Sequence, residues 1–197
     1  MYRIKLMNRL SCILMTAFLM AGMNATTALA QKHKDALKDA RDALKAGNHA
    51  TAYTKYEEAY RGAQAAGDQA VKDTVRADIL NIAADATQGG ATPAQADQAL
   101  NALTSMQQYV EPEPEAYYYM AVAYKAKRDY QQSVAMADKA LEIHRGSKTD
   151  KAKIYFVKGE ALMSLNYNNE AKAAFENATY GSYKARAEAY LNQLGKQ

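Results

Sequence analysis

The chain has 197 residues, with 25 basic and 21 acidic side chains and a formal net charge of +4. Three of the basic residues and none of the acidic ones fall in the first 30 positions. The remainder therefore carries 22 positive charges against 21 negative ones, a net charge of +1. This balance gives no electrostatic argument for a nucleic-acid or membrane partner. We expect neither.

The first 30 residues have the pattern of a secretory signal peptide. Basic residues at 3, 5 and 9 precede an apolar run over 10–21, and Ala28-Leu29-Ala30 forms an A-x-A cleavage site. The apolar run is short for a membrane span, so a transmembrane anchor is the less favoured interpretation. We predict cleavage after Ala30 and export to the periplasm or outside the cell.

Removal of this segment would also remove Cys12, the only cysteine of the chain. We therefore expect an exported chain that starts at Gln31, contains no thiol and is not stably inserted in a membrane after cleavage. Without disulfides, such a chain depends on its core for stability. About 167 residues are enough for one domain with a substantial core.

Apolar residues recur with helical spacing along the rest of the chain, and turn or capping residues separate the segments. These signals are Gly47-Asn48, Gly89-Gly90, Thr92-Pro93, Arg128-Asp129, Asn166 and, as the N-cap of a last helix, Ser182. The interruptions are too frequent for one continuous coiled coil. The sequence therefore predicts an all-α protein of short helices.

The stretch 114–147 shows the most regular pattern. Residues on one face of its first helix are Tyr117, Met120, Ala121 and Tyr124, and small residues of its second helix are Ser133, Ala137 and Ala140. This stretch resembles a tetratricopeptide repeat (TPR), a 34-residue helix–turn–helix with the pattern W-x2-L-G-x2-Y followed by A-x3-F. Tyr117 stands in the place of the Trp, Ala121 in that of the Gly, and Tyr124 matches the Tyr.

A second stretch resembles the same repeat, with Tyr155 and Gly159 in its first helix and Ala171, Phe175 and Ala178 in its second. The resemblance implies a TPR-like domain over 31–197. Its predicted parts are repeats at about 33–66, 67–113 (irregular), 114–147 and 152–185, and a capping helix at about 182–195. It also implies that antiparallel helix pairs form a right-handed α-solenoid closed by that helix.

No arrangement of residues indicates catalysis. The three histidines, His33, His49 and His144, have no second ligand at helical spacing, so we predict surface histidines and no metal site. The sequence contains no nucleophile-elbow motif and no glycine-rich phosphate loop. We expect no catalytic residues, no cofactor and no enzymatic activity.

Candidate binding residues follow from the resemblance, because the first helix of each TPR lines a concave groove. The positions that this register places in the groove are Leu37, Arg41, Tyr118, Tyr119, Val122, Lys125, Phe156, Glu160 and Met163. A large apolar residue recurs at one equivalent place, as Leu37, Tyr118 and Phe156. Exposed apolar residues often mark binding sites. The alternative is that these three side chains contact neighbouring helices.

Three functions remain open on the sequence. The first is a protein–protein interaction module that binds a peptide or partner protein in the groove. The second is a structural subunit of a cell-envelope assembly that uses its outer faces. The third is a glycan or small-molecule binder that uses Tyr118, Tyr119 and Phe156. The fold resemblance favours the first, and the oligomeric state stays open.

Overall fold

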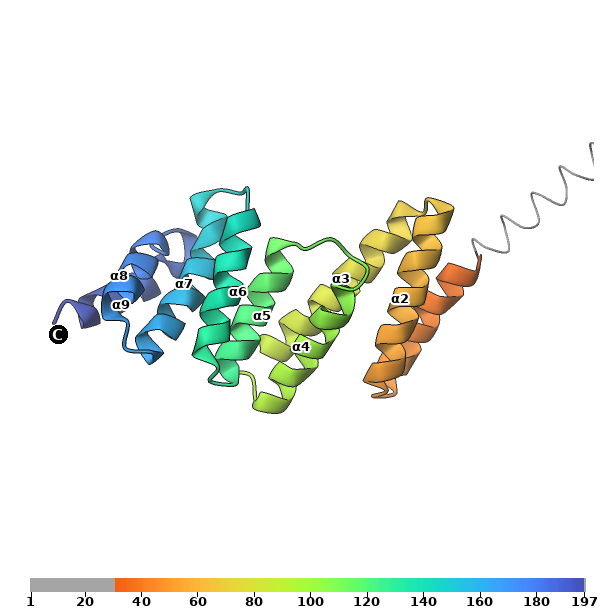
Figure 1. Cartoon of the computed structure of the whole chain (residues 1–197), viewed down its shortest axis with the longest axis horizontal. Coiled ribbons are helices and arrows are strands. Elements are labelled where there is room, and N and C mark those ends of the chain that lie inside the picture. Colours follow the sequence, from red (N-terminus) through yellow and green to blue (C-terminus); the bar gives the residue numbers. More distant parts are fainter. Residues whose placement is uncertain (1–30, 197) are drawn as a thin grey trace, which may run out of the picture. The chain divides into compact units, whose positions relative to one another are not determined.

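The computed structural model describes residues 31–196. The predicted signal peptide, residues 1–30, lies outside this range. Within the described residues the chain forms helices joined by turns, without a β-strand (Figure 1). The prediction of an all-α protein is confirmed.

In chain order the elements are a helix whose described part covers 31–45, α2 (His49–Ala66), α3 (Gln69–Thr87), α4 (Pro93–Met106), α5 (Pro114–Ala126), α6 (Tyr130–Ile143), α7 (Lys148–Ser164), α8 (Asn168–Asn177), the 3-10 turn η1 (Gly181–Tyr183) and α9 (Lys184–Leu194). The described residues divide into two compact units, 31–75 and 76–196, and the division falls within α3. Each unit is described separately.

Four of the helix-to-helix turns have the same backbone geometry. Their central residues have left-handed φ angles, namely Gly47 (75°), Gly67 (69°), Arg128 (64°) and Asn166 (63°). The next N–H reaches back five residues to close the turn, as from Asn48 to the Ala43 carbonyl at 2.9 Å and from Asp129 to the Tyr124 carbonyl at 2.9 Å. This is the Schellman arrangement, which satisfies carbonyls at a helix end. The chain therefore makes the same hairpin turn repeatedly, with or without glycine.

The residue after each left-handed position lies immediately before the first residue of the next helix. Asn48, Asp68 and Asp129 each accept a hydrogen bond from a backbone N–H three residues later, at 3.3, 3.2 and 3.2 Å. A side-chain cap of this kind stabilises a helix by about 1 kcal/mol. Tyr167, at the fourth turn, makes no such bond.

Two predicted starts of helices have different outcomes. Thr92 caps α4 in a capping box with Gln95, which confirms that prediction. The prediction that Ser182 caps the last helix is wrong. Ser182 lies inside η1, and α9 begins at Lys184 without a side-chain cap bond.

The prediction of a surface position for His33 is also wrong. Its side chain is 1% exposed, and its Nε2 lies 3.0 Å from Oδ2 of Asp68. Gly62 of α2 allows the close approach, because a Cβ at that glycine would lie 2.8 Å from the His33 Cβ. The hydrogen bond from His33 is the main cause of the lowered pKa of Asp68. His33 therefore ties the first helix to the turn between α2 and α3.

In the second unit, consecutive helices from α4 to α9 pack against each other, and α5 also contacts α7. Small residues permit this packing. Ser133 of α6 donates a hydrogen bond to the Ala121 carbonyl of α5 at 2.8 Å, and both residues are fully buried. On α7, a Cβ at Gly159 would lie 2.7 Å from the Phe175 ring of α8. Two of the places that the TPR resemblance assigns to small residues are thus tight helix contacts.

Candidate binding surface

The contact between α5 and α7 brings seven of the predicted binding residues onto neighbouring helices, with Tyr119 on α5 among them. Tyr118, Val122 and Lys125 lie on α5, and their counterparts 38 positions later lie on α7. An ion pair between Lys125 and Glu160 joins the two helices directly. Leu37 and Arg41 belong to the first unit, where Leu37 is buried and Arg41 is exposed.

Phe156 does not have the exposed position that we predicted for it. It is 2% exposed, and its ring centroid lies 5.7 Å from that of Phe175. On its other side the Arg186 guanidinium lies 4.2 Å from the ring centre, and the Tyr183 ring is 5.3 Å away. The prediction of an exposed groove aromatic is therefore wrong for Phe156. The alternative, contact with neighbouring helices, describes it correctly.

Glu160 is the centre of one polar network on this surface. Besides Lys125, its carboxylate accepts a hydrogen bond from the Tyr190 hydroxyl at 3.2 Å and lies 3.7 Å from Arg186. Burial, and then the charge of Glu160, raise the pKa of Tyr190. The network joins α5, α7 and α9, and it leaves the Glu160 side chain 15% exposed.

Glu115 and Lys153 form a second network at the other end of the surface. The Lys153 ammonium lies 2.6 and 2.8 Å from the two Glu115 oxygens and 4.8 Å from the centre of the Tyr118 ring. Burial is the first cause that raises the pKa of Tyr118, followed by its hydrogen bond with Tyr183. Burial and then the Glu115 charge raise the pKa of Tyr119. Both tyrosines therefore stay neutral at ordinary pH.

Between the two networks lies a group of partly exposed, uncharged side chains. We call Tyr118, Tyr119, Val122 and Met163 the binding surface. The rings of Tyr118 and Tyr119 lie 5.1 Å apart at an angle of 56°. Aromatic and Met side chains are enriched in protein interfaces, while charged side chains are depleted at their centres. The composition of this surface, aromatic and Met side chains without charge, matches that enrichment.

Several residues that shape this surface were missed by the sequence analysis. Glu115 and Lys153 have opposite charges and are separated by the same 38 positions as Tyr118 and Phe156. The repeat register would therefore have predicted this ion pair. Helical spacing relates Tyr183 of η1 to Arg186 and Tyr190 of α9, which would have indicated one contacting face of this segment. No local signal shows that this face covers α7.

In the part of the chain that the structure describes, no group of three or more His, Cys, Asp or Glu side chains could hold a metal ion. Among the helices of residues 31–196, none combines the length and the apolar character of a membrane span. Comparison of the chain with models of protein families, with curated proteins and with solved structures gives no match. The functional argument therefore depends on the geometry.

Proposed function

We propose that the chain is a non-enzymatic, TPR-like protein–protein interaction module that binds a peptide or partner protein. The observation that carries the proposal is the binding surface of Tyr118, Tyr119, Val122 and Met163, which lies between two networks of paired charges. The recurring Schellman turns and the tight contacts at Ser133 and Gly159 support a repeated hairpin. We further propose that these hairpins continue as a right-handed solenoid.

Tyr119 is the best residue with which to test partner binding. It is only partly buried, and a tyrosine that acts as a hot spot typically contributes about 2 kcal/mol to binding, or about 30-fold in affinity. Tyr119→Ala should therefore reduce about 30-fold the affinity for a partner identified by cross-linking and mass spectrometry in intact cells. The melting temperature should stay close to that of the parent protein. Tyr167→Ala, at a 53% exposed tyrosine outside the surface, is the matched control.

The second candidate function, a structural subunit that uses its outer faces, is favoured by a different observation. A largely apolar cavity of about 340 Å³ lies among Val134 of α6, Tyr155 and Leu162 of α7, and Ala174 of α8. Ala173 is exposed at its edge, so Ala173→Glu would place a charge there without disturbing the core. Loss of the partner with Ala173→Glu, together with retention in Tyr119→Ala, would favour this function and contradict the proposed binding surface.

We also propose that the protein is exported, with cleavage after Ala30, and acts in the periplasm or outside the cell. The protein recovered from that compartment should begin at Gln31 and lack a reactive thiol, because Cys12 is removed with the leader. Intact-mass measurement and labelling with a maleimide reagent test both statements. A full-length chain that takes up the label in the membrane fraction would show that the leader is retained.

A further inference from the structure

A cavity of about 400 Å³ lies beside the binding surface and is a separate feature of the second unit. It is lined by Glu115 of α5, by His144 just after α6, by Thr149, Asp150 and Lys153 of α7, and by Ser182 and Tyr183 of η1. Its residues come from four segments of the chain.

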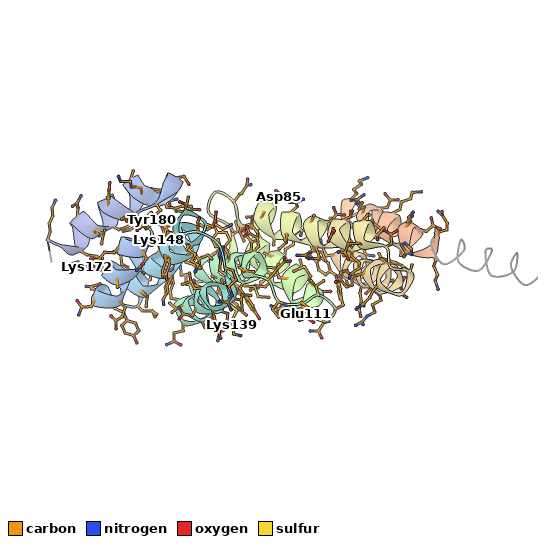
Figure 2. The ribbon with its side chains drawn as sticks, turned by 90° about the horizontal axis from the view of Figure 1, so that it is seen from above. Asp85, Glu111, Lys139, Lys148, Lys172 and Tyr180 are labelled. Atoms are coloured by element: carbon orange, nitrogen blue, oxygen red, sulfur yellow. The ribbon has the colours of Figure 1, made fainter. Side chains whose placement is uncertain are left out.

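The walls of this cavity are fixed by local contacts. At the start of α7, the Ser147 N–H donates to the Asp150 carboxylate at 2.9 Å, and the Asp150 N–H donates to the Ser147 hydroxyl at 3.3 Å. Lys148 and Tyr180 lie side by side (Figure 2), with the ammonium 3.5 Å from the Tyr180 hydroxyl and 5.6 Å from the ring centre. These contacts hold the start of α7 next to the segment that leads into η1. A cavity formed in advance lowers the cost of ordering on binding.

Local hydrogen bonds define a donor atom on one lining residue and an acceptor atom on another. The Gly146 N–H donates to Nδ1 of His144 at 2.8 Å, so in the neutral ring the proton is on Nε2 and is available to donate. Both hydrogen bonds from Ser147 go to Oδ2 of Asp150. These bonds lower the pKa of Asp150, which keeps the group an ionised acceptor. Its Oδ1 has no hydrogen bond to another described residue.

Two hydroxyl groups and an aromatic ring complete the lining. Among the described residues, the hydroxyls of Thr149 and Ser182 make no hydrogen bond, and each can both donate and accept. Tyr183 contributes a partly buried ring, and its side chain is hydrogen-bonded to that of Tyr118. Glu115 and Lys153 neutralise each other at the cavity edge.

We propose that this cavity binds a small, uncharged, polyhydroxylated ligand of the size of a monosaccharide. The imidazole donor, the carboxylate acceptor and the two hydroxyls suit a molecule whose groups both donate and accept, and the ring offers an apolar wall. Charged ligands fit less well. An anion would meet the carboxylate of Asp150, and a cation would have only that one carboxylate to pair with, because Lys153 already neutralises Glu115.

The proposal is tested by titrating the isotopically labelled protein, as recovered from cells, with D-glucose, D-mannose and N-acetyl-D-glucosamine while amide spectra are recorded. At least one sugar should cause saturable shifts concentrated at residues 144–150 and 181–183. Thr149→Val combined with Ser182→Ala removes two hydrogen bonds and should weaken that binding at least about tenfold. Both residues are exposed, so the double variant should keep a dispersed spectrum.

Asp138→Asn is the matched control, because Asp138 is an exposed aspartate of α6 outside the cavity, paired with Lys158 at 2.5 Å. It should bind the sugar as tightly as the parent protein does. The proposal is overturned if none of the three sugars gives saturable shifts at the cavity. It is also overturned if the double variant binds with unchanged affinity, or if only L-arginine or inorganic phosphate shifts these amides. Partner capture is not part of this readout, so the two proposals fail independently.

Discussion

Replacing Phe175 with alanine should lower the free energy of unfolding by about 3 to 5 kcal/mol, the usual cost of emptying a buried aromatic position. Phe175 is fully buried, and its ring stacks on that of Tyr190 at 4.6 Å and 4°. It also lies against Phe156 and the surface of Gly159. Urea unfolding followed by circular dichroism measures the loss.

The control for this variant is Tyr167→Ala, since an exposed side chain far from special contacts usually changes stability by less than about 0.5 kcal/mol. If the two units unfold in separate steps, the whole loss in free energy of unfolding should appear in the step of the second unit. A Phe175→Ala protein with an unchanged midpoint would contradict the packing of α7 against α8.

The second large effect is expected on deleting residues 181–197, which removes η1 and α9. The deletion uncovers Phe156 and Phe175 on the side where Tyr183, Arg186 and Tyr190 now cover them. Burying one large apolar side chain contributes about 1.5 to 3 kcal/mol. The deletion exposes parts of Phe156 and Phe175 and removes the contacts of Tyr190, so it should cost about 4 kcal/mol or more. The melting temperature should fall by more than 10 °C, at roughly 3 to 5 °C per kcal/mol for a unit of this size.

Deletion of residues 195–197 alone is the control, because it shortens the chain beyond the last residue of α9. It should melt at nearly the temperature of the full chain. Equal melting temperatures for both truncations would mean that α9 does not cover α7 and α8. The same result would contradict the burial of Phe156 beneath η1 and α9.

The positions of the helices along the chain were predictable because their signals are local. Gly47 supplies the left-handed conformation of a turn, and Thr92 forms its capping box with a residue three positions away. Ser182 was assigned wrongly because a good capping residue also suits a 3-10 turn, and only the packing of η1 decides between them. His33 shares a helix face with Ala36 and Ala40, both buried, so its burial was available from spacing.

The binding residues were harder to predict because exposure depends on distant segments. Tyr118 and Phe156 are equivalent in the repeat register, yet one remains partly exposed and the other is in the core. The difference arises from Arg186, 30 positions after Phe156, whose guanidinium covers its ring. The ion pair of Lys125 with Glu160 likewise connects helices that are not consecutive. Periodicity gives the face of a helix but not the segment that covers it.

The Schellman turns described above also bear on how the chain folds. The turns at Gly47, Gly67, Arg128 and Asn166 are each completed by hydrogen bonds that span three and five residues. Contacts this close in sequence form quickly, because little chain entropy is lost in closing them. A hairpin can therefore close as soon as its own two helices are available, without waiting for the rest of the polypeptide. For a chain that emerges progressively from one end, folding can then advance one hairpin at a time.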